Sequence, residues 1–250
     1  MIEIAAKNFS SVEIFTNGTL LNERWIEVIK QNKVKIAVSV YSYNAEEHDK
    51  VTLAKGSCKL TNQSIELLKR NGIQYRVCNV LMKGIDIGSR NTLLYQLSSE
   101  KDIVRMAGRA NGKLLSQDLA KKQLITQENF SKEINPILIK RNMNCHNCFS
   151  KKIYISSDLM VYPCVMERRL VHGSLRKNEL PEILNESIMN LNKDYILECK
   201  DCEYRYACFD CRPNSLDGVI KSKPWYCTYD PYKGEWQNIE EFIEKLFLVL

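Results

Sequence analysis

Eight of the ten cysteines in this 250-residue sequence lie in its second half, where their spacing could support metal chemistry. Three pairs have two residues between their cysteines, and this spacing forms a tight turn that points both thiolates at one centre. Zinc sites and iron–sulfur sites both use it. The eight are Cys145, Cys148, Cys164, Cys199, Cys202, Cys208, Cys211 and Cys227. Eight thiolates make two four-cysteine centres, so the sequence predicts a metal-binding domain.

The surroundings of the cysteines favour metal ligation over disulfide bonds. The first residues do not resemble a secretory signal, and no apolar run approaches the length of a membrane span. We therefore expect a reducing, cytoplasmic compartment, where clustered cysteines are metal ligands first. Cys58 and Cys78 lie outside the clusters, and we expect each to be a small buried apolar residue.

Composition and charge are those of an ordinary folded protein. Hydrophobic residues make up 44% of the chain, which is enough for a core. The net charge of +6 is spread along the chain without a long basic run. A solvated surface explains this charge better than nucleic-acid binding does, so we expect neither a nucleic-acid partner nor a membrane.

The elements that must position these residues begin with an α/β alternation. We expect strands at 12–15, 34–40 and 73–82, and helices at 2–7, from Asn22 onward and from about Thr61 to the Asn71-Gly72 stop. The polar segment with His48 and Asp49 reads as a loop, and residues 91–108 have helical patterning. Short links between these elements imply right-handed parallel crossovers. The sequence thus predicts part of a parallel α/β domain, either a barrel or an open sheet.

The cysteine-rich half has shorter elements. Any helix near Glu128 should end before Pro136. Residues 152–164 alternate on both sides of Ser157-Asp158 and predict a hairpin that delivers Cys164. A helix should begin near Pro181 and run to Leu191, and another should begin at Ile239.

The cysteine array resembles the SPASM domain, the auxiliary iron–sulfur domain of radical SAM peptide maturases. That family has two early cysteines, a hairpin cysteine, a C-x2-C-x5-C-x3-C run and one last cysteine. Further likeness comes from Thr16-Asn17-Gly18 after a strand, Ser39 at the end of the next strand, and His48-Asp49 ahead of Gly56-Ser57. The strings Cys164-Val-Met-Glu-Arg-Arg and Cys202-Glu-Tyr-Arg-Tyr are similar to maturases of small ribosomally made peptides.

The resemblance implies a fold, cofactors and a substrate. We expect an α/β partial radical SAM (β/α) barrel at 1–110, a linker at 111–142, and a small cysteine-rich α+β SPASM domain at 143–250. Two auxiliary 4Fe–4S clusters are implied. The first would be held by Cys145, Cys148, Cys164 and Cys211, and the second by Cys199, Cys202, Cys208 and Cys227. Asn17 and Ser39 would face S-adenosylmethionine in the complete enzyme, whose substrate would be a precursor peptide that receives a thioether or another crosslink.

Two local departures and one absence separate the chain from the family pattern. The cysteine run ends in C-x2-C, one residue shorter than usual, and Leu159 stands where a hairpin glycine is common. The C-x3-C-x2-C motif of the cluster that cleaves S-adenosylmethionine does not occur. We therefore assign no catalytic residue and expect the chain alone to be inactive. It would be a fragment or one half of a split enzyme, with an electron donor and a second chain as partners.

Alternative interpretations of the same residues stay open. Eight cysteines also suit two zinc sites in a non-catalytic module that recognises a peptide or nucleic acid. The Glu167-Arg168-Arg169 cluster could grip an acidic leader peptide or form a surface salt-bridge group. His146 and His172 read as bystanders beside so many thiols. The aromatic residues near the cysteines could stack on bases, but packing around the centres is favoured for Tyr204, Tyr206, Phe209, Trp225, Tyr226 and Tyr229.

Overall fold

The computed structural model describes residues 2–89, 100–104, 113–131, 134–215 and 218–249. The chain divides into two compact units, residues 1–104 and residues 105–250, which are described separately below. Within the described residues, no helix combines the length and the apolar character that crossing a bilayer requires.

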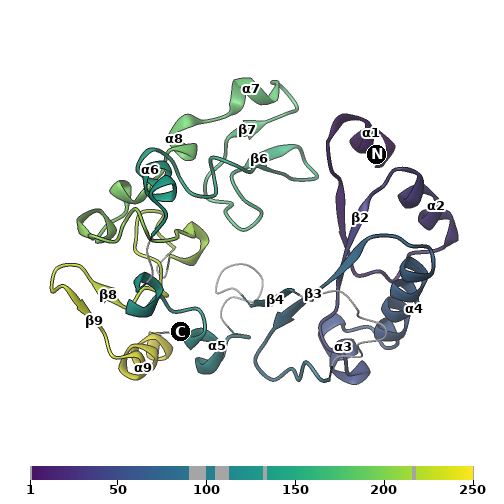
Figure 1. Cartoon of the computed structure of the whole chain (residues 1–250), viewed down its shortest axis with the longest axis horizontal. Coiled ribbons are helices and arrows are strands. Elements are labelled where there is room, and N and C mark those ends of the chain that lie inside the picture. The colour runs from purple at the N-terminus through teal and green to yellow at the C-terminus, as the bar shows by residue number, and fades with distance from the viewer. Residues whose placement is uncertain (1, 90–99, 105–112, 132–133, 216–217, 250) are drawn as a thin grey trace. The chain divides into compact units, whose positions relative to one another are not determined.

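A four-stranded parallel sheet is the centre of the first unit (Figure 1). Its strands are β1 (Glu13–Thr16), β2 (Lys35–Ser39), β3 (Tyr75–Leu81) and β4 (Glu100–Ile103). Their spatial order equals their order in the chain, and every neighbouring pair is parallel. Sequential parallel strands of this kind are typical of a slice of a (β/α) barrel, as expected from the sequence.

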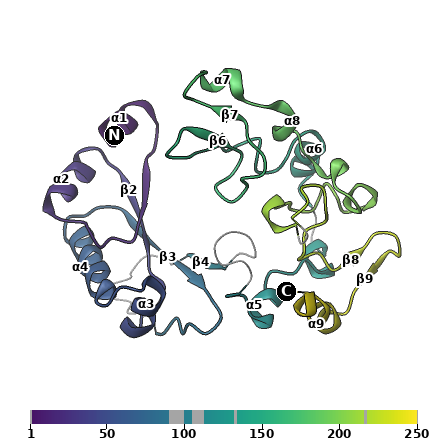
Figure 2. The same ribbon diagram turned by 180° about the vertical axis from the view of Figure 1, so that it is seen from behind.

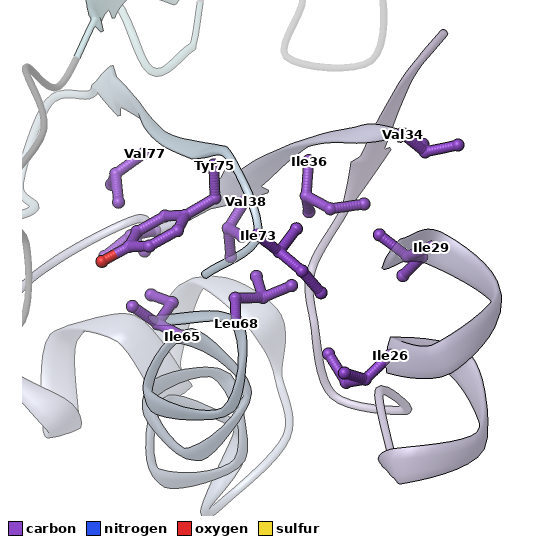
Figure 3. Close-up of a cluster of buried hydrophobic side chains, with 11 residues drawn as sticks. Ile26, Ile29, Val34, Ile36, Val38, Ile65, Leu68, Ile73, Tyr75 and Val77 are labelled. Carbon is purple, nitrogen blue, oxygen red and sulfur yellow. The ribbon is translucent and has the colours of Figure 1, made fainter. Parts of the chain in front are cut away.

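The first unit also contains the helices α1 (Ile2–Asn8), α2 (Glu23–Gln31), α3 (Ala45–Thr52) and α4 (Ser57–Arg70). Of these, α2 and α4 pack against the sheet with buried apolar residues. The side chain of Asn22 caps α2 by accepting from the backbone N–H of Trp25. Figure 3 shows Ile26 and Ile29 of α2 with Ile65 and Leu68 of α4 beneath the strands. These apolar faces explain why the two helices fold onto the sheet.

Three expectations for the first unit need correction. The segment with His48 and Asp49 is helix α3 and not a loop, because Asn44 caps it and His48 is buried on its inner face. Helix α4 begins at Ser57 and not near Thr61. Residues 100–103 were expected to be helical but form β4 by pairing with β3. The other residues of the predicted 91–108 helix, except Val104, lie outside the described residues.

The second unit is built from short elements. In chain order these are α5 (Gln117–Lys121), η1 (Gln127–Phe130), α6 (Pro136–Asn144), β5 (Tyr154–Ile155), β6 (Met160–Tyr162), β7 (Gly173–Ser174), α7 (Leu180–Ile183), α8 (Glu186–Met189), η2 (Lys193–Tyr195), η3 (Cys199–Asp201), η4 (Arg212–Asn214), β8 (Tyr229–Asp230), β9 (Glu235–Trp236) and α9 (Ile239–Val249). Figure 2 shows the longer of these elements from behind. Elements this short bury little apolar surface, so we expect metal ligation to contribute to the stability of this unit.

The expected hairpin is present, while the helix at Pro181 is interrupted. Strands β5 and β6 are antiparallel, and β7 adds a third strand to their sheet. Leu159 adopts a left-handed backbone with φ +66° in the turn, the conformation for which glycine is common. The predicted helix to Leu191 is wrong in extent, because α7 ends at Ile183 and Asn185 caps a separate α8. The predicted terminal helix from Ile239 is confirmed as α9.

Candidate metal centre

Four of the predicted ligands line one cavity of the second unit. Cys199, Cys202, Cys208 and Cys227 lie around it, and we call it the four-cysteine cavity. Cys199 opens η3, and Cys202 follows its last residue. Cys227 forms a parallel β-bridge with Ile125. In this bridge the N–H of Ile125 donates to the carbonyl oxygen of Tyr226 at 2.8 Å. These are the four cysteines that the sequence resemblance assigns to a second cluster, and the fold brings them together.

Aromatic side chains form much of the remaining wall of the four-cysteine cavity. Tyr204 contacts Phe130 with ring centroids 4.6 Å apart and meets Tyr229 edge-on at 5.2 Å. Tyr229 is 4.7 Å from the ring of Trp236. These rings exclude water and lower the local polarity around the thiols.

Burial makes the thiols of this cavity hard to ionise without a cation. It raises the pKa of Cys199 to about 12 and also raises the pKa of Cys202 and Cys208. Lys193 opposes this effect at Cys208, because its Nζ donates a hydrogen bond to Sγ of Cys208 over 3.0 Å. A bound metal centre supplies the positive charge that favours the thiolate form.

The first predicted ligand set is brought together in part. Cys148 and Cys164 both pack against the cluster of Phe149, Ile188 and Leu191, and burial raises the pKa of Cys148. Cys145 is the C-cap of α6, where its N–H donates to the carbonyl oxygen of Arg141 at 3.0 Å.

Cys211 immediately precedes η4, and its loop is attached to the Cys145–Cys148 turn. Nδ2 of Asn147 donates to the carbonyl oxygen of Asp210 at 3.2 Å. The N–H of Asp210 donates to Oδ1 of Asn147 at 3.3 Å. Asn147 lies between Cys145 and Cys148, while Asp210 directly precedes Cys211. This double contact holds the Cys211 loop beside the first cysteine pair.

His146 and His172 have structural partners. Nδ1 of His146 accepts from the backbone N–H groups of Cys148 and Phe149 at 3.0 and 3.1 Å, so it orders the cysteine turn. Its ring stacks on Phe149 with centroids 3.8 Å apart. Nδ1 of His172 accepts from the N–H of Asn185, and burial lowers the pKa of His172. Sequence reasoning treated both as bystanders and missed these positioning roles.

A buried ionic group was also missed from the sequence. Asp210 and Arg212 form an ion pair with Nη2 and Oδ1 2.5 Å apart, and the guanidinium of Arg212 is fully buried. Both residues lie in a polar stretch that resembles a surface loop, so only their position beside the cysteines could have indicated a role.

Further expectations about individual side chains had mixed outcomes. Glu167 is buried and paired with Arg169 at 2.6 Å, so this pair is part of the fold and not an exposed salt-bridge group. Trp225, Tyr226 and Tyr229 are buried as predicted. Phe209 is 57% exposed, so its predicted packing is wrong, because its neighbours Cys208 and Asp210 take the buried positions of this loop.

Asn17 and Ser39 lie at the same edge of the first unit's sheet. The pairing of Thr16 with Val38 places them at the carboxyl ends of neighbouring parallel strands, where ligands of α/β folds bind. The carbonyl oxygens of Asn17 and Gly18 accept from the hydroxyls of Thr61 and Ser64 in α4 at 2.8 and 2.5 Å. Helix α4 therefore fixes the turn that carries Asn17.

The residues of the second unit fit an iron–sulfur group. Among the described residues, no three or more His, Cys, Asp or Glu side chains form a single-ion site. The four-cysteine cavity nevertheless offers four thiols with a buried ammonium beside them. This donor chemistry suits an anionic, thiolate-ligated cluster with hydrogen bonds to its sulfurs.

Comparison with known proteins is consistent with this chemistry. Residues 145–212 match the SPASM family, described as an iron–sulfur cluster-binding domain. A 79-residue segment is 39% identical to the antilisterial bacteriocin subtilosin biosynthesis protein AlbA of Bacillus subtilis; it covers 31% of this chain and 18% of AlbA. An alignment of 296 positions gives 21% identity to the cysteine-type anaerobic sulfatase-maturating enzyme of Clostridium perfringens, over 99% of this chain and 76% of that enzyme.

Solved structures show the same fold over most of the chain. Native anSMEcpe with bound AdoMet superposes with a TM-score of 0.58 and 19% identity, covering 97% of this chain and 76% of that one. A polyhistidine-tagged form with bound AdoMet has a TM-score of 0.60 with 17% identity and covers 97% and 73%. Residues 145–212 thus match an iron–sulfur cluster-binding domain, and the chain has the mixed α/β fold of anSMEcpe over most of its length.

Proposed function

We propose that this chain is the auxiliary-cluster part of a radical SAM maturase that modifies a ribosomally synthesised precursor peptide. The observation that carries the proposal is the four-cysteine cavity, three of whose cysteines lie in the segment that matches the SPASM family. The similarity to a bacteriocin biosynthesis protein and to a sulfatase-maturating enzyme supports a peptide or protein side chain as the substrate. A thioether or a related crosslink is the proposed product.

Two 4Fe–4S clusters are proposed, with the eight cysteines as ligands. The four-cysteine cavity would hold one of them. Cys145, Cys148, Cys164 and Cys211 would hold the other. The contacts between Asn147 and Asp210 support this allocation, because they keep Cys211 beside the first pair despite the shortened spacing of the run.

When bound, a cluster ligated by four thiolates has no open coordination position and supplies one-electron transfer. The protein then has three tasks in the second unit. Its thiolates hold the metal, its aromatic side chains exclude water, and His146 orients the Cys145–Cys148 turn. In the first unit, Asn17 and Ser39 would bind S-adenosylmethionine at the carboxyl edge of the sheet.

Radical generation is proposed to depend on residues outside these 250. The sequence has no C-x3-C-x2-C motif, so no open cluster site is available from it. A separate segment or chain would supply that motif, and a low-potential electron donor would supply electrons. Alone, the chain given S-adenosylmethionine and dithionite should release no 5′-deoxyadenosine.

The decisive test is to measure iron, acid-labile sulfide and zinc in protein purified without oxygen. Close to eight irons per chain with matching sulfide is the result expected for two 4Fe–4S clusters. About two zinc ions without sulfide would overturn the proposal and favour the binding-module alternative.

A further inference from the structure

Lys193 is a buried lysine whose position the cysteine chemistry explains. Its side chain is 6% exposed, and its Nζ lies 3.0 Å from Sγ of Cys208. Lysine is almost never buried this fully without a partner for its charge. Among the described residues, Sγ of Cys208 is the hydrogen-bond acceptor of this ammonium group.

The scaffold directs Lys193 inward. Asn192 caps η2 by accepting from the N–H of Asp194 at 3.1 Å, and its Nδ2 donates to the carbonyl oxygen of Met143 at 2.6 Å. Ile196, which follows η2, is fully buried. Lys193 is thus held between an anchored asparagine and a buried isoleucine, and it lines the four-cysteine cavity.

The nearby carboxylates make their closest ion pairs with other groups, and Asp210 acts on the Lys193 ammonium only through space, without a hydrogen bond. Asp210 forms its ion pair with Arg212 and approaches His146, and Asp194 pairs with Arg205 at 3.0 Å. A neutral thiol is a weak acceptor and leaves a buried ammonium poorly compensated. A thiolate bound to a metal centre carries negative charge, so it is a suitable partner for this cation.

We propose that Lys193 sets the reduction potential of the cluster held by Cys208. This inference rests on the proposed second cluster. Reduction adds one electron to the cluster and increases the negative charge beside Nζ. The ammonium and its hydrogen bond therefore stabilise the reduced form more than the oxidised form and raise the potential. The electron comes from the low-potential donor of the proposed function, or from dithionite in the test.

The test compares three variants of the whole chain, each reconstituted with iron and sulfide without oxygen. Lys193→Met removes the charge and the donor, while Lys193→Gln removes the charge and keeps an N–H donor. Lys200→Met is the matched control, because Lys200 is exposed and adjoins Cys199. Iron content, far-UV circular dichroism and the midpoint potentials from a dithionite titration followed by EPR are measured for each.

The expected result is a lower potential for one of the two reduction steps in Lys193→Met, with iron content and circular dichroism kept. A change of about tenfold in the reduction equilibrium corresponds to about 59 mV for one electron. Lys193→Gln should shift the same step by a smaller amount, and Lys200→Met should leave both steps in place. If Lys193→Met does not load the cluster, the midpoint potential of Lys193→Gln tests the proposal, which then requires a lower potential for the same reduction step.

Three outcomes would overturn the assignment. An unchanged potential in loaded Lys193 variants would do so, as would an equal shift in Lys200→Met. Loss of the cluster from both Lys193 variants would show a structural requirement and not a tuning role. A native chain without iron would instead refute the proposed function, so the two failures are distinguishable.

Discussion

Nε2 of His146 lies 3.5 Å from Oδ2 of Asp210, and both side chains are buried. His146 belongs to the turn between Cys145 and Cys148, whereas Asp210 belongs to the loop between Cys208 and Cys211. The contact therefore joins two cysteine-bearing segments that are far apart in the chain. Arg212 completes the group by pairing with the other carboxylate oxygen of Asp210.

Replacing Asp210 with alanine should strongly destabilise the second unit. The change leaves the guanidinium of Arg212 buried without its carboxylate, which costs about 3–5 kcal/mol in typical proteins. Urea unfolding of the loaded chain, followed by circular dichroism, measures the loss. Asp201→Ala is the control, because this aspartate is exposed in the same cysteine run and should cost less than about 0.5 kcal/mol. Equal losses in the two variants would contradict the role of the ion pair.

Cysteine substitutions should separate ligands from bystanders. Cys208→Ala should lose one cluster, about half of the iron, because it removes a thiol from the four-cysteine cavity. Cys78→Ala should keep the full iron content, because Cys78 lies on β3 in the other unit. The measurement is iron per chain after anaerobic reconstitution. Full iron in Cys208→Ala would show that the predicted ligand set is wrong.

Acid should loosen the start of α4 through Asp49. Hydrogen bonds from the N–H groups of Cys58 and Gly56 hold the pKa of Asp49 below its usual value. A lowered folded pKa means that the stabilisation is complete above the unfolded pKa and is lost as the pH falls through the folded pKa. We expect the loss below about pH 4.

The measurement is hydrogen exchange of residues 56–60 in the native chain and in Asp49→Asn at the same pH. Protection should be higher in the native chain at neutral pH, and the difference should shrink below about pH 4. A difference that stays constant down to about pH 3 would rule out the carboxylate as its source.

Leu159→Gly should stabilise the β5–β6 hairpin. A left-handed backbone costs roughly 1–2 kcal/mol for a residue with a side chain, and glycine costs roughly 0.5–1 kcal/mol of extra chain entropy. The balance favours glycine by up to about 1.5 kcal/mol. Thermal unfolding measures the gain, with Leu159→Ala as the control that keeps the backbone penalty. A lower melting temperature for the glycine variant than for the alanine variant would disprove the argument.

Sequence periodicity was sufficient for the buried strands and most of the helices of the first unit. Residues 34–40 are nearly continuously apolar, and β2 was found there at Lys35–Ser39. Strand β4 was missed because Glu100–Ile103 is short and mostly polar, so its conformation depends on pairing with β3. Helix α3 was missed for a similar reason, since its charged residues conceal the single buried His48.

In the candidate site, too, the sequence predicted the features that depend on local spacing and missed those that depend on contacts in the folded chain. Spacing predicted the C-x2-C cysteines as metal ligands, because such turns are local, whereas the grouping of Cys199 and Cys202 with Cys208 and Cys227 came from the family resemblance. Lys193 could not be recognised, since Asn192-Lys-Asp resembles a surface segment, and for Asp210 the sequence offered only its position between Cys208 and Cys211. Their burial follows from contacts with Met143, Asn147 and Cys208, which only the folded chain brings together.

The loop from Cys208 to Cys211 would also limit the distance between the two proposed redox centres. Cys208 lines the four-cysteine cavity, and the Cys211 loop is attached to the Cys145–Cys148 turn. Three residue steps separate the two cysteines, which is at most about 11 Å between their Cα atoms. A centre held by Cys208 and a centre held by Cys211 would therefore be close to each other, because a short stretch of chain connects their ligands. An electron leaving one centre would have a short path to the other, in any conformation of the surrounding loops.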